Sequence, residues 1–280
     1  MTELKILALH PVQYQVPFFR AIIEAGIDID VTYFHQGTAG RRARDIEFGI
    51  DIEWDMDLLS GYPHRFLTNT NNDYRLQTQL RIIPSMLFWA LSDRRKPLLL
   101  VGWSLHVIWL VWLLRILFRM PVISFSETTP QSFAASPKPQ WRTQLLSWLL
   151  CHNDACLYIG SNNRQFLLNQ GVDETRLFHT PYSVDNSHYE LGKAHYDRQS
   201  IRAQFGVAVD LPAFLFVGKL IEVKRTVQLL EAYLAAGLKD KTQLIFVGEG
   251  QLREVLEVRA KAAKAKNVHV VGFLNYSQMP

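Results

Sequence analysis

Segments with the character of β-strands alternate with segments of helical periodicity along almost the whole chain of 280 residues. Strands are expected at residues 4–9, 98–101 and 122–126, and a helical pattern follows each of them, for example at residues 17–25. This alternation is typical of a parallel β-sheet that is covered by helices on both faces. The sequence therefore predicts an α/β protein.

The apolar periodicity fades after Tyr182, and a second alternation of strands and helices begins at Phe214. We expect a doubly wound N-terminal domain at residues 1–184, a linker with one short helix at 185–210, and a partial C-terminal domain at 211–280. Only three strands fit into the last segment, which is fewer than an independent parallel sheet usually has. The second domain is therefore expected to be incomplete, with an unpaired buried edge.

Two apolar runs in the C-terminal segment each stop at a glycine. The first, FLFV at 214–217, is followed by Gly218, Lys219 and, five residues later, Lys224; the second, LIFV at 244–247, is followed by GEG at 248–250. A glycine at the carboxyl end of a buried parallel strand lets a phosphate approach the backbone, and nearby lysines neutralise it. A solvated basic turn before a helix is the alternative, and the spacing alone does not separate the two interpretations.

The charge balance is nearly even, with 30 Lys and Arg against 26 Asp and Glu, a formal net charge of +4. This balance favours an acidic substrate or an anionic surface, and it is too weak to indicate nucleic acid as a partner. Cys151 and Cys156 have no second pair that would complete a zinc site, so we interpret both as core thiols. The N-terminus carries no secretory signal pattern, and a cytoplasmic location is expected.

Residues 98–118 are mostly apolar and have about the length that a bilayer core requires. Gly102, Trp103 and Ser104 interrupt this stretch, and Arg115 lies within it. We therefore expect a buried strand, a turn, and a helix with Ser104 as its N-cap; insertion into a membrane is the alternative.

Three polar residues, His10, Gln13 and Tyr14, follow the first expected strand. Open parallel sheets bind ligands at the carboxyl edge of their strands. These residues are therefore candidates for contact with a ligand, while a role in capping the turn is the alternative.

Several motifs share their order with one known family. In the C-terminal half they are FVGKL at 216–220, FVGEGQLR at 246–253 and NVHVVGF at 267–273, and in the N-terminal half HPVQY at 10–14, WS at 103–104, SET at 126–128 and YSVD at 182–185. The chain resembles the group 1, or GT4-type, retaining glycosyltransferases over nearly its whole length. The resemblance implies a GT-B fold, in which two Rossmann-like domains face each other and the C-terminal one holds most of the nucleotide sugar.

The resemblance also implies roles for individual residues in binding the donor. It assigns the donor diphosphate to Lys219 and Lys224, beside Gly218. It places Gly248 and Gly250 along the donor pocket and the backbone of Phe273 and Leu274 beside the nucleotide base.

In the N-terminal domain, the resemblance implies a catalytic role for Glu127, at a position where many relatives have a histidine near the donor sugar. Glu127 would orient a sugar hydroxyl or stabilise positive charge on the anomeric carbon. The loop with His10, Gln13 and Tyr14 would contact the acceptor or the diphosphate.

The function implied is transfer of a sugar, with retention, from a nucleotide-sugar donor to a glycan or lipid-linked acceptor. No metal or cofactor is expected, because lysines and a helix N-terminus neutralise the diphosphate. Peripheral association with the inner face of a membrane is a further interaction that we consider. Members of the family carry a Glu-x7-Glu motif beyond the point where this sequence stops, so we expect a truncated enzyme; the alternative is a catalytically silent subunit that needs a partner chain.

Overall fold

The computed structural model describes residues 3–45, 48–69, 74–193 and 197–279. The chain forms two compact units: Met1–Ala39 with Leu58–Val184, and Gly40–Asp57 with Asp185–Pro280. Residues 40–57 were expected within the N-terminal domain, whereas they pack with the second unit. The reason is that their contacts are with residues far away in the sequence, which local pattern does not indicate.

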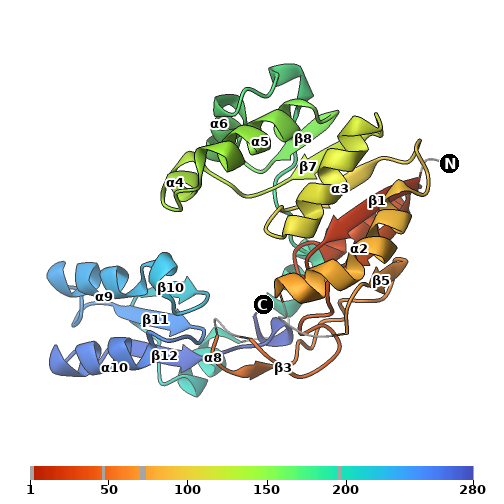
Figure 1. The fold of residues 1–280 in the computed structure, drawn as a ribbon. Helices are drawn as coiled ribbons and strands as arrows, with labels where there is room; N and C mark the ends of the chain where they lie inside the picture. The colour runs from red at the N-terminus through yellow and green to blue at the C-terminus, as the bar shows by residue number, and fades with distance from the viewer. Residues whose placement is uncertain (1–2, 46–47, 70–73, 194–196, 280) are drawn as a thin grey trace. The chain divides into compact units, whose positions relative to one another are not determined.

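The first unit is built on a seven-stranded sheet with the order β5-β2-β1-β6-β7-β8-β9 (Figure 1). Every pair of neighbouring strands is parallel, which confirms the expected fold class. The strands are β1 (Glu3–Ala8), β2 (Asp28–Tyr33), β5 (His64–Phe66), β6 (Leu98–Val101), β7 (Val122–Phe125), β8 (Ala155–Tyr158) and β9 (Leu177–His179). From β1, the strands β2 and β5 lie on one side of the sheet and β6 to β9 lie on the other. The strand order therefore reverses between β1 and β6.

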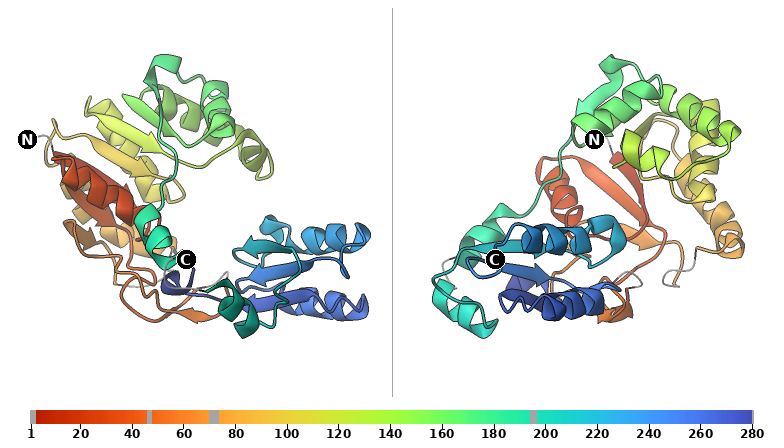
Figure 2. Two further views of the ribbon diagram at one scale, coloured as in Figure 1. Left: turned by 180° about the vertical axis from the view of Figure 1, so that it is seen from behind. Right: turned by 90° about the vertical axis from the view of Figure 1, so that its left-hand side faces the viewer.

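Helices cover both faces of this sheet. In Figure 1, α2 (Leu76–Leu91) and α3 (His106–Leu117) lie on the face toward the viewer, and the view from behind in Figure 2 shows α1 (Val16–Glu24) on the other face. Pro17 lies in the first turn of α1, where its missing N–H costs nothing. The remaining helices of the unit are α4 (Pro130–Ala134), α5 (Gln140–Cys151), α6 (Ser161–Asn169) and the short 3-10 helix η1 (Glu174–Arg176).

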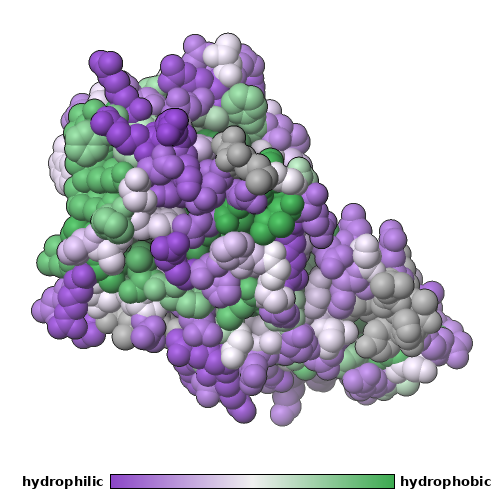
Figure 3. Space-filling view, turned by 90° about the vertical axis from the view of Figure 1, so that its right-hand side faces the viewer, coloured by the Kyte–Doolittle hydropathy of each residue, from purple (hydrophilic) through white to green (hydrophobic). Residues whose placement is uncertain are grey.

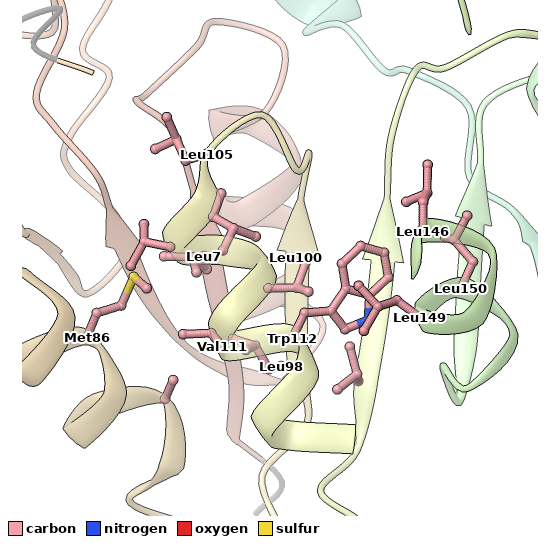
Figure 4. Packing of buried hydrophobic residues seen from close by; sticks show 14 of the residues in the cluster. Leu7, Met86, Leu98, Leu100, Leu105, Val111, Trp112, Leu146, Leu149 and Leu150 are labelled. Atoms are coloured by element: carbon pink, nitrogen blue, oxygen red, sulfur yellow. The ribbon is translucent and has the colours of Figure 1, made fainter. Parts of the chain in front are cut away.

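The main hydrophobic core lies between the sheet and helices α2, α3 and α5. Figure 4 shows side chains of the three helices pointing toward those of the strands; the labelled residues are Leu7, Leu98 and Leu100 from the strands, Met86, Val111, Trp112, Leu146, Leu149 and Leu150 from the helices, and Leu105. The Trp112 indole N–H donates to Asn153 Oδ1 at 2.7 Å. The polar end of this large ring is thereby satisfied inside the core.

The apolar stretch at residues 98–118 folds as the strand and helix that the sequence predicts. Arg115 is fully buried, and its guanidinium donates to the carbonyl oxygens of Ala90, Lys96 and Pro121 at 2.6, 2.6 and 2.8 Å. No helix in the described part of the chain is long and apolar enough to cross a membrane. The N-cap assignment was wrong: Leu105 is the N-cap of α3, because the extended backbone continues one residue beyond Ser104.

The second unit contains a parallel sheet with the order β10-β11-β12, formed by β10 (Ala213–Val217), β11 (Gln243–Val247) and β12 (Val268–Gly272). Helices α9 (Thr226–Ala235) and α10 (Arg253–Ala262) pack on one face, where Leu230, Leu244, Phe246 and Leu256 form a small core. The unit also includes α7 (Asn186–Lys193), α8 (Arg198–Gln204), the 3-10 helices η2 (Glu222–Lys224) and η3 (Tyr276–Gln278), and an antiparallel pair of β3 (Ala43–Arg44) and β4 (Asp51–Ile52).

Two expectations for the second unit were wrong. The apolar run at 214–217 was expected to be a buried strand, but Phe214, Leu215 and Val217 are 50%, 64% and 48% exposed. The reason is that β10 lies at the edge of the described sheet, beside β11. The described part of the expected linker also contains two helices, α7 and α8, rather than one, since the polar sequence of α7 gives little apolar periodicity.

Candidate functional site

A cavity of about 770 Å³ opens in the first unit at the carboxyl edge of its sheet. It lies where the strand order reverses, because the loops after β1, β6 and β7 contribute His10, Trp103 and Glu127 to its lining. A reversal of strand order leaves two adjacent loops diverging to opposite faces, and this divergence creates a crevice for ligands. The sequence predicted this edge as a binding site and named Glu127, His10 and Tyr14, which all line the cavity.

One carboxylate and two phenols meet in this cavity. The hydroxyl of Tyr14 donates to Glu127 Oε1 at 3.3 Å, and the rings of Tyr14 and Tyr182 make an edge contact with their centroids 4.7 Å apart. Burial and the neighbouring Glu127 carboxylate raise the pKa of Tyr14 to about 12, and the same two causes raise the pKa of Tyr182. Both phenols therefore remain protonated near neutral pH and serve as hydrogen-bond donors beside the carboxylate.

His10 is held at the rim of the cavity by stacking on a second histidine. Its ring lies 5.3 Å from that of His35, and its Nδ1 is 3.1 Å from the carbonyl oxygen of Pro11. Gly37 packs directly under His10, since a Cβ at Gly37 would lie 3.3 Å from the His10 Cβ. Gln13 is not among the described residues that line the cavity, whereas Gln15 is.

Several residues of the cavity were not among the sequence-based candidates. Five of them are Trp109 on α3, Phe133 on α4, Lys138 and Arg142 beside and within α5, and Tyr182. Tyr182 belongs to one of the motifs that carried the resemblance, so a signal for it was present. The other four lie in segments whose pattern indicates only amphipathic helices and a loop.

The glycines of the second unit hold two loops against each other. A Cβ on Gly248 would overlap the carbonyl oxygen of Gly218, and a Cβ on Gly250 would lie 2.5 Å from that of Leu220. Backbone hydrogen bonds join the same loops, from Gly218 N to Val247 O at 3.0 Å and from Leu220 N to Glu249 O at 2.8 Å. The glycines that follow β11 are thus required by close backbone packing.

Lys219 lies among residues of the 40–57 segment. Its ammonium is 3.4 Å from each carboxylate oxygen of Asp45 and 4.8 Å from the centroid of the Phe48 ring. Phe273 makes edge contacts with Phe48 and Trp54, with centroids 5.4 and 5.3 Å apart. The segment therefore brings Lys219 and Phe273, two of the predicted donor residues, next to one aromatic cluster.

Two other predicted donor residues, Lys224 and Leu274, have different surroundings. Lys224 is exposed at the end of η2. Leu274 lines an apolar cavity of about 400 Å³ between α8 and the sheet, together with Val217 and Val247, and Lys219 is not among the described residues of its lining.

Comparisons with known proteins agree with this architecture. Residues 197–280 match the family described as glycosyl transferases group 1. No curated protein sequence matches the chain.

Solved structures resemble the chain over nearly its full length. A glycosyltransferase from Rickettsia africae has a TM-score of 0.67 at 11% identity, with 99% of this chain and 69% of that chain covered. HepE of Anabaena, solved in complex with UDP, has a TM-score of 0.63 at 13% identity, with 97% and 70% covered. Sucrose-phosphate synthase from Thermosynechococcus elongatus has a TM-score of 0.61 at 15% identity, with 99% and 72% covered.

The chain therefore has the two-domain fold of GT-B glycosyltransferase structures, and its C-terminal part carries the signature of the group 1 glycosyltransferases. These findings confirm the resemblance and the fold class that the sequence predicted. At these identities, the similarity to solved structures concerns the fold alone.

Proposed function

We propose that the protein transfers a sugar from a nucleotide-sugar donor to a glycan or lipid-linked acceptor, with retention of configuration, as GT4-type enzymes do. The observation that carries this proposal is the family match over residues 197–280, which include Lys219, Lys224 and Phe273. HepE, a structural relative, was solved with UDP, which supports a nucleotide as the kind of ligand.

The chemistry of the second unit suits a donor diphosphate. Lys219 is partly buried against the Phe48 ring, and an ammonium with restricted access to water binds phosphate more strongly than a fully solvated one. Lys224, five residues later, adds a second positive charge at the same end of the sheet. Two cations stabilise the charge that develops on a departing nucleoside diphosphate, which is the main demand of glycosyl transfer.

The cavity of the first unit is assigned to the acceptor. There the Glu127 carboxylate accepts hydrogen bonds from acceptor hydroxyl groups, while Tyr14 holds it by a hydrogen bond and packs on Tyr182. The aromatic side chains around it provide flat apolar faces of the kind that pack against sugar rings.

Calorimetric titration with UDP tests the donor assignment. Replacing Lys219 and Lys224 together by alanine removes two charge-assisted contacts and is expected to weaken UDP binding by about 1 to 3 kcal/mol. The matched control is the double alanine variant of Lys241 and Lys261, two exposed lysines of the same unit. Equal UDP affinity for both double variants would remove Lys219 and Lys224 from the site.

A catalytically silent subunit that binds a partner chain is the second candidate. The exposed edge strand β10 favours it, because a strand edge with apolar side chains offers a surface for pairing. Turnover of nucleotide sugars by this chain alone, compared with turnover in the presence of a candidate partner, separates the two functions.

We also propose that the first unit associates peripherally with a membrane on the cytoplasmic side. Four apolar residues, Leu76, Leu80, Pro84 and Phe88, recur at every fourth position of α2 and are all exposed, Phe88 by 81%. Figure 3, which views the side on which α2 lies in Figure 1, shows hydrophobic residues gathered in several groups among hydrophilic ones. The α2 sequence contains no acidic residue, and the exposed Arg81 lies within it, so the helix carries no negative charge that an anionic lipid surface would repel.

Co-sedimentation with lipid vesicles tests this association. We expect binding to vesicles that contain phosphatidylglycerol, weak binding to phosphatidylcholine alone, and a loss of at least about fivefold in affinity for the L80S/F88S double variant, since each exposed apolar side chain contributes about 1 kcal/mol or more on burial. W141S, which changes an exposed tryptophan on α5, is the control. Equal binding of the parent protein and both variants would contradict the role of α2.

A further inference from the structure

The cavity of the first unit contains positive charges that transfer to a neutral sugar hydroxyl would not require. Lys138 and Arg142 line it, and Glu127 is the only carboxylate among the described residues of its lining. The two cations come from the loop before α5 and from its first turn, four residues apart in the sequence. This concentration of positive charge calls for a chemical explanation.

Neither cation is neutralised by a described residue of the protein. The Lys138 ammonium donates to the carbonyl oxygen and the hydroxyl of Ser136, at 3.3 and 3.0 Å. Within the described ranges, no carboxylate lies within ion-pair distance of Lys138 or Arg142. By contrast, Arg253 and Arg176 elsewhere in the chain bind a carboxylate and backbone carbonyl oxygens, respectively.

Arg142 is held in place by an aromatic ring. Its guanidinium carbon lies 5.5 Å from the centroid of the Trp109 ring, and Trp109 is itself fixed by a hydrogen bond from its indole N–H to the Trp103 carbonyl oxygen at 2.7 Å. A guanidinium that lies over an indole ring presents its N–H groups at the edge, in the planar arrangement that binds phosphate or carboxylate in two-point fashion. The side chain is therefore positioned for an anion.

The same part of the cavity offers apolar faces next to the cations. Trp103, Trp109 and Phe133 line it, and Phe133 packs on Phe166 of the core with ring centroids 5.2 Å apart. A ligand that satisfies both features carries an anionic group directly beside a sugar ring or an alkyl chain.

We propose that this cavity binds an anionic acceptor, with its phosphate or carboxylate at Arg142 and Lys138 and its apolar face against Trp103 and Trp109. The proposal rests on the proposed function in assigning the cavity to the acceptor, and it adds the chemical class of that acceptor. Glu127 faces the same ligand from the loop after β7, so the anionic group is expected at the α5 side, away from the carboxylate, which would repel it.

Binding measurements with four probes test the proposal. We would titrate the protein calorimetrically with glucose 6-phosphate and glucose, and with decyl phosphate and decyl maltoside. The anionic member of each pair is expected to bind at least about tenfold more tightly than the neutral one, which corresponds to about 1.4 kcal/mol. Preference within the first pair indicates a sugar phosphate as the source of the anion, and preference within the second pair indicates a phosphorylated amphiphile.

Variants connect this preference to the named residues. R142Q should abolish most of the preference, K138Q should reduce it, and R142K should retain part of it, because the charge remains while the planar geometry is lost. The control is R95Q, which removes an exposed arginine outside both the cavity and α2. Thermal unfolding of each variant shows whether it is folded. If R142Q does not fold, K138Q still tests the proposal, because Lys138 is exposed and its replacement is not expected to disturb the fold.

The outcomes separate this inference from the proposed function. Equal affinity for anionic and neutral probes, or an unchanged preference in both R142Q and K138Q, would overturn the anionic acceptor. Tight binding of the anionic probe with no sugar transfer to it from any nucleotide sugar would leave the anion site in place and count against the transferase. Transfer to neutral acceptors with the same KM as to anionic ones would support the transferase and reject the inference.

Discussion

The ammonium of Lys219 lies 3.4 Å from both carboxylate oxygens of Asp45, a residue 174 positions earlier in the chain. The backbone N–H of Phe48 donates to the same carboxylate at 2.9 Å. A carboxylate from the 40–57 segment thus pairs with the lysine that is proposed to hold the donor phosphate. Binding of a diphosphate at Lys219 requires this carboxylate to move aside or to tolerate a second negative charge beside it.

Asp45→Asn is accordingly expected to strengthen UDP binding. Removing the competing charge makes the ammonium more available and ends the repulsion between the carboxylate and the phosphate. For a partly exposed ion pair these two effects together are worth about 0.5 to 1 kcal/mol, which is a change of about two- to fivefold in UDP affinity. Calorimetry at low ionic strength measures the change. The control is D51N, on β4 of the same segment; weaker binding by D45N would instead mean that Asp45 positions Lys219 for the donor.

Gly248→Ala should destabilise the second unit strongly. The added Cβ would overlap the Gly218 carbonyl oxygen, and relief requires movement of backbone at the ends of both β10 and β11. We expect a loss of at least about 2 kcal/mol in the free energy of unfolding, measured by urea denaturation.

Gly237→Ala is the matched control for that substitution. Gly237 also has a positive φ of +67°, but an added Cβ there would meet no described heavy atom within 4 Å. Only the backbone strain of about 1 kcal/mol is expected there. Equal losses for the two variants would show that the close approach of Gly218 and Gly248 is not what constrains the position.

Stability above pH 10 should depend on Tyr14. The pKa of Tyr14 is raised from 10.0 to about 12 in the folded protein, so the unfolded state loses this proton first, and its contribution to stability falls as the pH rises from 10 toward 12. Tyr14→Phe is expected to reduce the difference in the free energy of unfolding between pH 9 and pH 11.5. An identical pH dependence in the variant and the parent protein would contradict the raised pKa.

Arg115→Met should lower the stability of the first unit. The guanidinium supplies hydrogen bonds to three carbonyl oxygens, those of Ala90, Lys96 and Pro121, and methionine fills the volume without replacing them. We expect a loss of about 3 kcal/mol, in the range for removing a buried charged donor. R81M, at an exposed position of α2, should change the unfolding free energy by less than about 0.5 kcal/mol. A small effect of R115M would mean that water satisfies these carbonyls.

The sequence predicted the parts of the fold that depend on local pattern. Most of the strands and helices between residues 3 and 179 follow apolar periodicity, and the position of Glu127 at the end of β7 follows from the alternation of elements. Strand β5 and helix α7 were missed, since β5 has three residues and α7 is largely polar. Neither segment carries enough periodicity to be distinguished from a loop.

The site depends more on contacts between distant segments, which local pattern does not contain. Asp45 meets Lys219, and Trp54 meets Phe273, only because residues 40–57 pack with the second unit. Gly248 and Gly250 are expected to admit a phosphate, and that role stays a prediction. What the structure shows is that the backbone of the facing loop leaves no room for a side chain at either position. Motif order indicated the family whose model matches residues 197–280, but it did not reveal Arg142 over Trp109.

The cavity of the first unit is lined largely by loops, while the strand residues Val101 and Phe125 and residues of α3, α4 and α5 complete its lining. Exchanging a few residues after β1, β6 or β7 therefore alters what is recognised and leaves the hydrogen-bonded scaffold intact. The ligand preference of this cavity is accordingly open to redesign by grafting short loops, with little risk to folding.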